Sequence, residues 1–128
     1  MKTTLTCLFA ASAMLILPAA ESFAEGDGNW KRGRIYYRAA CTSCHTAEIG
    51  ESISPASKRI AEWEEWIETP EGAEHLAQYV SQDYRAEIAP DNKVAEKFAP
   101  IANDDLWADI RAFVIYGAKD SATPATCN

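Results

Sequence analysis

An all-α fold is predicted for this chain of 128 residues, from three observations. No segment alternates apolar and polar residues in the way that a half-buried strand does. Several segments instead repeat apolar residues at three and four positions, and Ser, Thr, Asn, Pro and Gly mark their ends. With 48% hydrophobic and 24% charged residues, the composition is that of one compact domain.

Residues 1–24 are expected to be an export signal and not part of that domain. Lys2 supplies a positive start, and the stretch Leu5–Leu17 is apolar apart from Thr, Ser and Cys. The small residues Ser22 and Ala24 then precede a polar segment, as at a cleavage site. The apolar stretch is short for a membrane span, so export to the periplasm is expected. An uncleaved N-terminal anchor is the alternative.

The remaining domain would cover residues 25–128, with a short flexible tail over 118–128. The chain carries 12 Lys and Arg against 19 Asp and Glu, a net charge of −7. This acidity disfavours nucleic acid or an anionic membrane surface as a partner, and after signal removal no membrane span is expected. It favours a docking partner with a basic patch, although surface acid also simply keeps small proteins from associating.

The first two helices are predicted on either side of a pair of cysteines. The first covers residues 30–40, and its apolar face is expected to consist of Ile35, Tyr36 and Ala39. The second begins at Ser54-Pro55, because Ser is a good cap and Pro is tolerated in the first helical turn. It ends at Thr69-Pro70, and the residues expected along one of its faces are Ile60, Trp63 and Ile67.

Two more helices complete the prediction. A third helix is expected over residues 71–84, and its inward-facing residues would be Leu76, Tyr79, Val80 and Tyr84. Residues 85–102 contain two prolines with Asp and Asn and are predicted to be mostly loop. The last helix begins with Asn103 as N-cap and two acidic residues in its first turn, and Gly117 ends it. Its apolar repeat is Leu106, Ile110 and Phe113.

The cysteines point to a specific chemistry. Cys7 belongs to the signal, which leaves Cys41, Cys44 and Cys127, an odd number for a disulfide framework. Residues 41–45 read Cys-Thr-Ser-Cys-His, the arrangement for attachment of a c-type haem. Each thiol would add across one haem vinyl group, and the imidazole of His45 would bind the iron. One covalently attached haem c is therefore the expected cofactor.

Two other uses of the cysteine pair stay open. A thioredoxin-like redox pair would want a strand before it, whereas a helical pattern precedes Cys41. Structural zinc would want further ligands and usually a second pair, and Cys127, one residue from the end of the sequence, is a poor candidate. Cys127 is expected to lie in a frayed tail or to react with another thiol.

Both ends of the domain resemble class I cytochromes c. Gly33, Tyr37 and Cys41 fall at steps of four before His45, as in the opening segment of that family, and Phe113 occupies the usual aromatic place in the last helix. The resemblance implies a small cytochrome c-like domain whose N- and C-terminal helices cross, closely at Gly33, around one covalently bound haem. It also implies that a proline carbonyl, here that of Pro55, accepts the proton of the proximal imidazole.

The sequence departs from that family at the sixth iron ligand, which is usually a Met. Its only methionines, Met1 and Met14, lie in the signal. His75 is the sole other His and the tentative distal ligand, which would give a lower potential than Met, although it could equally be a surface residue. Lys93 and Lys97 lie where the ligating loop is expected, and an open or water-filled position is the remaining choice.

The predicted function is electron transfer by a single c-type haem, which makes the chain an electron carrier and not an enzyme. An open iron would instead bind a small gas or peroxide, as in a sensor or a weak peroxidase. Two charge clusters are candidates for orienting a partner. The basic cluster is Lys31, Arg32, Arg34 and Arg38, and the acidic cluster is Glu62, Glu64, Glu65, Glu68, Glu71 and Glu74.

Overall fold

The computed structural model describes residues 28–45 and 53–126, and these residues form helices and loops without a β-strand. The predicted all-α fold is thus confirmed for the described part of the chain. In chain order the elements are α1 (Trp30–Tyr36), the π-helical turn η1 (Tyr37–Cys41), the 3-10 turn η2 (Pro55–Ser57), α2 (Ile60–Glu68), α3 (Pro70–Val80), α4 (Gln82–Ile88), α5 (Lys93–Phe98) and α6 (Asn103–Tyr116). The expected signal and Cys127 lie outside the described residues.

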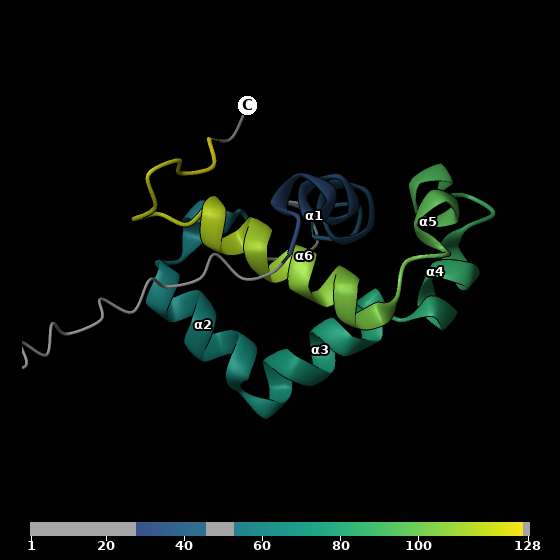
Figure 1. Ribbon diagram of the computed structural model, residues 1–128, viewed down its shortest axis with the longest axis horizontal. Coiled ribbons are helices and arrows are strands. Elements are labelled where there is room, and N and C mark those ends of the chain that lie inside the picture. Colours follow the sequence, from purple (N-terminus) through teal and green to yellow (C-terminus); the bar gives the residue numbers. More distant parts are fainter. Residues whose placement is uncertain (1–27, 46–52, 127–128) are drawn as a thin grey trace, which may run out of the picture.

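The crossing of α1 over α6 organises the domain (Figure 1). A Cβ atom on Gly33 would lie 2.1 Å from the carbonyl oxygen of Asp109, and one on Gly28 would lie 2.0 Å from that of Ala108. Only residues without a side chain allow the two backbones to approach so closely. The expected place of Gly33 at a close helix crossing is therefore confirmed.

Polar and aromatic contacts reinforce this crossing. Asp109 is buried, accepts a hydrogen bond from the backbone N–H of Asn29 at 2.7 Å and forms an ion pair with Arg32. The ring of Tyr37 packs edge-on against Phe113, with 5.2 Å between the ring centroids. Leu106 and Ile110 of α6 are fully buried beneath them, and burial of each such side chain contributes about 1.5–3 kcal/mol.

The buried face of α1 differs from the predicted one. Ile35 is 55% exposed, whereas Gly33, Tyr36, Tyr37 and Ala40 are buried. Because α1 packs against α6 through Gly33, the residues one turn further along share its face, and Ile35 points away from it. The prediction for Tyr36 is confirmed and that for Ile35 is wrong.

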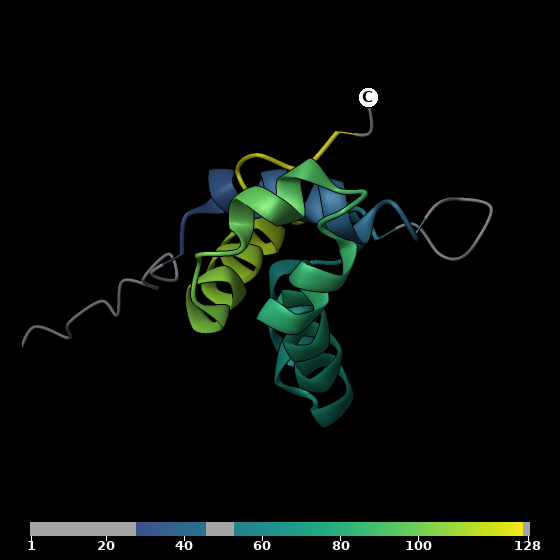
Figure 2. The same ribbon diagram turned by 90° about the vertical axis from the view of Figure 1, so that its right-hand side faces the viewer.

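The other helices form two arms around α6. Figures 1 and 2 show α2 and α3 meeting in a V on one side of it, with α4 and α5 beyond the start of α6. Trp63 and Ile67 of α2 and Leu76 and Val80 of α3 are buried. The predicted end of the second helix at Thr69 is confirmed. Its predicted start at Ser54-Pro55 is a separate 3-10 turn, and α2 begins five residues after Pro55, at Ile60, with Arg59 as its N-cap.

The predictions for residues 71–102 are partly wrong, because two short polar residues start new helices. Ser81 is extended (ψ 147°), and its hydroxyl accepts the N–H of Tyr84, so the expected single helix is divided into α3 and α4. Asn92 accepts the N–H groups of Val94 and Ala95, which starts α5 inside the expected loop. Asn103 is not the N-cap of α6, which is Ala102.

Asn103 instead binds Arg85, a fully buried side chain that joins α4, α5 and α6. The Arg85 guanidinium donates to the carbonyl oxygens of Ser81, Phe98 and Ile101 and to Asn103 Oδ1. Within the described residues it has no carboxylate partner. Its burial lowers the pKa of the guanidinium from the ordinary value.

Arg85→Met is expected to lower the free energy of unfolding by about 1–3 kcal/mol, because the carbonyl oxygens and the Asn103 side chain would lose their donor. Urea unfolding followed by circular dichroism would measure the loss. Arg38→Met is the matched control, since Arg38 is exposed. Equal stability of the two variants would contradict a structural role for the buried guanidinium.

The segment after α6 returns to the start of α2. The N–H of Lys119 donates to the carbonyl of Lys58 at 2.9 Å, and the N–H of Ile60 donates to Asp120 Oδ1 at 2.8 Å. Gly117 is the C-cap of α6, as expected, and a Cβ there would lie 2.9 Å from Pro55 Cβ. Lys119 and Asp120, which lie in the expected tail, thus bind the start of α2. None of the helices in the described ranges has the length and apolarity needed to span a bilayer.

Candidate functional site

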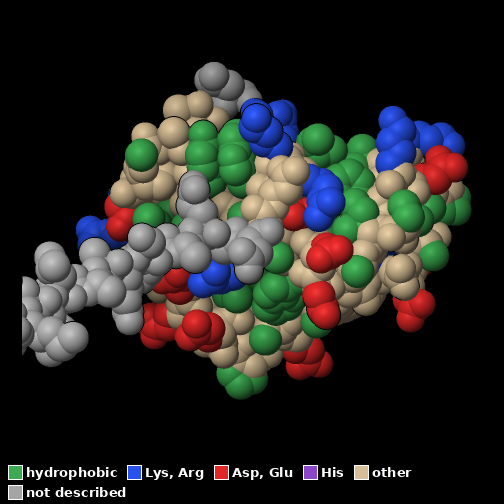
Figure 3. All heavy atoms as spheres, in the orientation of Figure 1, with side chains coloured by type: hydrophobic (Ala, Val, Ile, Leu, Met, Phe, Trp, Pro, Cys, Tyr) green, Lys and Arg blue, Asp and Glu red, His purple; other side chains and the backbone are tan. Residues whose placement is uncertain are grey.

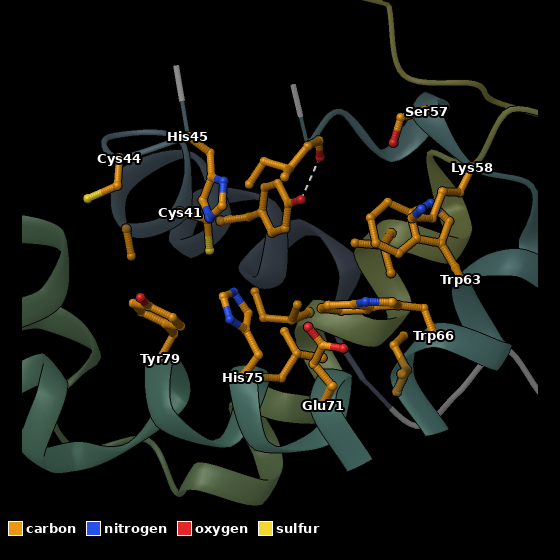
Figure 4. Close-up of a pocket in the computed structure, with 17 residues that line it drawn as sticks. Cys41, Cys44, His45, Ser57, Lys58, Trp63, Trp66, Glu71, His75 and Tyr79 are labelled. Carbon is orange, nitrogen blue, oxygen red and sulfur yellow. Dashed lines mark hydrogen bonds between the residues drawn. The ribbon is translucent and has the colours of Figure 1, made fainter. Parts of the chain in front are cut away.

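A cavity of about 680 Å³ lies between η1, α2, α3 and α6. This volume is within the range of roughly 300–1,000 Å³ that small-molecule and cofactor sites occupy. Its walls are mainly aromatic and aliphatic, with thiol, imidazole, ammonium and carboxylate groups at separate points. The polar and aromatic residues of the lining are labelled in Figure 4 and include Cys41, Cys44, His45, Ser57, Lys58, Trp63, Trp66, Glu71, His75 and Tyr79.

The Cys-x-x-Cys-His segment enters the cavity directly from the end of the first helix. The N–H groups of Cys44 and His45 both donate to the carbonyl of Cys41, at 3.3 and 3.0 Å, so the three residues form one compact turn. Cys41 directs its sulfur into the cavity, and Cys44 directs its sulfur away from the two imidazoles toward the surface (Figure 4). An exposed thiol of this kind is free to change its χ1 rotamer.

Two buried tyrosines hold the walls of the cavity in place. The Tyr37 hydroxyl donates to the carbonyl of Ile53 at 2.5 Å, and the Tyr36 hydroxyl donates to that of Tyr79 at 2.6 Å. Burial raises the pKa of both phenols well above the ordinary value, so both remain donors. The first bond ties η1 to the segment before η2, and the second ties α1 to α3, the helix that carries His75.

His75 lies opposite His45 across the cavity. The centroids of the two imidazole rings are 6.2 Å apart, and the ring planes make an angle of 67°. The His75 ring extends from α3 and lies between two other rings. The centroid of Trp66 of α2 is 6.0 Å away, and that of Tyr79 of α3 is 4.8 Å away. The structure therefore brings together the predicted proximal ligand and the tentative distal one, which are 30 positions apart in the sequence.

The spacing of the imidazoles fits a metal ion bound between them. Imidazole nitrogens bind first-row metals such as zinc at about 2.0–2.1 Å. An atom of a five-membered ring with bonds of about 1.33 Å lies about 1.1 Å from the ring centre. Two imidazoles sharing one metal in a line would then have centroids about 6.3 Å apart, against the 6.2 Å found here. A haem iron needs only these two protein ligands, because the porphyrin supplies the other four.

The other candidate ligands do not reach the cavity. Lys93 and Lys97 are exposed on α5 and are not part of the lining, and Lys93 pairs with Glu96 at 3.3 Å. The expected bond from His45 to Pro55 is also absent from the described contacts. The carbonyl of Pro55 instead accepts the indole N–H of Trp63 at 2.7 Å. This contact follows from the position of Trp63 one turn inside α2, directly beneath η2.

Sequence reasoning missed several lining residues, chiefly Ile53, Ser57, Lys58 and Glu71. Nothing in their spacing distinguishes them from ordinary loop or helix-surface residues. Glu71 is four positions before His75 on α3, so the same helix face presents both, and this i, i+4 relation was the one available signal. Trp63, Trp66 and Tyr79 also line the cavity.

The electrostatics of Cys41 do not favour thiol redox chemistry. Burial, with a smaller contribution from the neighbouring Cys44, raises the pKa of the Cys41 thiol to about 12. Reactive cysteine pairs have lowered thiol pKa values, because the thiolate is the nucleophile. In residues 28–45 and 53–126, moreover, no group of three or more His, Cys, Asp or Glu side chains is arranged to hold a metal ion such as zinc.

Alkylation would check this difference between the thiols. In the chain without cofactor, iodoacetamide at about pH 8 is expected to modify the exposed Cys44 and to leave Cys41 largely unmodified, since Cys41 stays protonated until the pH approaches about 12. Peptide mass spectrometry after short exposures would compare the two sites, with the urea-unfolded chain as control. Equal modification rates in the folded chain would contradict the raised pKa of the half-buried Cys41 thiol.

Comparison with protein-family models, curated proteins and solved structures found no match to this chain.

The charges around the cavity are divided between two sides. Residues 28–45 carry four basic side chains and no acidic one, whereas residues 60–80 carry six Glu and no Lys or Arg. On the face shown in Figure 3, basic side chains lie mostly along the upper edge, over α1 and α5, and acidic ones mostly in the lower half, over α2 and α3. A partner with fixed charges would meet the molecule in a preferred orientation.

Proposed function

We propose that this protein is an exported electron carrier with one c-type haem, attached through Cys41 and Cys44 and ligated by His45 and His75. The facing imidazoles across a cavity bordered by the two thiols are the observation that supports this proposal. The bound haem would supply a single one-electron couple at its iron. The residues of the chain attach, orient and enclose that group.

The residue types at the site suit this task. Two imidazoles leave no iron position for a substrate, which favours electron transfer over catalysis. Trp66 and Tyr79 restrict the ring of His75 from both sides, and the Tyr36 hydroxyl anchors the backbone at Tyr79. A ligand held by packing and a buried hydrogen bond would move little when the electron arrives, and so the reorganisation that limits electron transfer would be small.

The acidic side of the molecule indicates which class of protein partner it would bind. The helices α2 and α3 form one wall of the cavity and carry the six glutamates of residues 60–80. One of them, Glu71, belongs to the lining itself. A redox protein with a basic patch would be attracted to this side and repelled from the basic side over α1. We propose such a partner, with periplasmic location as expected from the leading segment.

The proposal is tested by producing the full chain in a host that matures c-type cytochromes. The purified protein is expected to be coloured, to exceed the bare-chain mass by one haem, and to give a low-spin reduced spectrum that carbon monoxide does not change. A colourless product with the mass of the bare chain would contradict the proposal. A coloured product that binds carbon monoxide at once would replace it by the gas-binding alternative.

A further inference from the structure

The two ends of the cavity differ in chemistry, and this difference supports an inference that rests on the proposed function. Cys41, Cys44 and His45 lie at one end, and Ser57 and Lys58 lie at the other (Figure 4). Among the described residues, Lys58 is the only Lys or Arg of the lining, and Glu71 is its only Asp or Glu. The end away from the thiols therefore carries the one positive charge that the described lining presents to the cavity.

Lys58 is held in this place by contacts on both its backbone and its side chain. Its carbonyl accepts the N–H of Lys119 at 2.9 Å. Its ammonium lies over the ring of Trp63, 5.8 Å from the centroid, and Trp63 is itself fixed by its bond to Pro55. No ion pair in the described part of the chain includes Lys58. A partly buried ammonium that faces a cavity without a carboxylate partner is suited to bind an anionic group.

The covalent structure of haem indicates which anion this would be. The two vinyl groups that form thioethers lie on one edge of the porphyrin, and its two carboxylate side chains lie on the opposite edge. If Cys41 and Cys44 fix the first edge, the second must point toward the other end of the cavity. We propose that Lys58, assisted by the Ser57 hydroxyl, binds the haem carboxylates at this end of the cavity.

This contact would matter because the domain is acidic. The carboxylate edge would bring two negative charges into a protein of net charge −7. The other charged side chain of the described lining is Glu71 of α3. Close to Lys58 along the chain, Glu62 accepts the N–H of Arg59 and Asp120 accepts that of Ile60, and the N–H of Lys119 donates to the Lys58 carbonyl. Enclosure in the cavity and nearby acidic groups raise a carboxyl pKa, and a cation within about 4–6 Å lowers it by about 1–3 units, so Lys58 would offset that rise for the haem carboxylates.

The test measures the midpoint potential of the haem-loaded full chain between about pH 5 and about pH 9 by optical redox titration. The wild type is expected to show a flat profile. In Lys58→Gln the carboxyl pKa would rise into this range, so the potential should fall as the pH rises and should lie below that of the wild type at high pH, because ionised carboxylates without a counter-charge favour oxidised iron. Lys58→Arg should restore the flat profile.

A control variant separates this contact from other effects. Lys119→Gln removes an exposed positive charge outside the cavity. It should keep the flat profile of the wild type. A Lys58→Gln profile that is flat at the wild-type potential would overturn the contact while leaving the proposed function intact. A chain that carries no haem would overturn both.

Discussion

Replacing His75 by Ala is expected to make the haem-loaded protein bind carbon monoxide. The wild type should bind none, and the variant should bind one molecule per chain. The ring of His75 lies opposite that of His45, and the lysines proposed as alternatives are exposed on α5 and outside the lining. No other imidazole is available in the chain, which contains two His. Loss of this side chain should therefore leave the iron open on one side and high-spin.

Optical spectra of the reduced protein with and without carbon monoxide would measure the change. Added imidazole should enter the space left by the side chain, restore the low-spin spectrum and slow carbon monoxide binding. Tyr79→Phe is the matched control, because it alters the ring next to His75 without changing an iron ligand. If His75→Ala and Tyr79→Phe gave the same spectrum as the wild type, His75 would be removed from the site.

The second large effect is expected at the crossing of α1 and α6. Gly33→Ala should lower the free energy of unfolding by about 1–3 kcal/mol or more, since overpacking of a tight contact costs this amount. The new Cβ would lie 2.1 Å from the carbonyl oxygen of Asp109, and a backbone atom cannot move away without separating the helices. Separation would also disturb Asp109, which binds Asn29 and Arg32 across the same crossing.

Urea unfolding of the wild type and of Gly33→Ala would measure this loss. Arg34→Ala is the control, because Arg34 is the exposed neighbour of Gly33 on the same helix. Alanine has a higher helix propensity than glycine by about 0.8–1.0 kcal/mol, so a crossing that tolerated the methyl group would make Gly33→Ala the more stable protein. An increase in stability would thus show that the helices are not in close contact at Gly33.

The helix boundaries that were predicted well are those that neighbouring residues in the sequence determine. The end of α2 at Thr69-Pro70 and the acidic first turn of α6 depend on residues within a few positions of each helix end. The errors at Ser81 and Asn92 have the opposite origin. Both residues can cap a helix or remain in a loop, and only packing of α4 and α5 around Arg85 decides that each begins a helix.

The amino-acid sequence by itself determined the all-helical fold and the thiol–thiol–imidazole segment at residues 41–45, because periodicity and short spacings encode both of them. The close approach at Gly33 was implied by the resemblance to class I cytochromes c, and the structure confirms the approach itself. Only the tertiary structure decided that His75 faces His45, that Lys93 and Lys97 stay outside, and that Lys58 faces the cavity from the end away from the thiols. These relations join residues of different helices, and their distances are set by how α1, α2, α3 and α6 pack together.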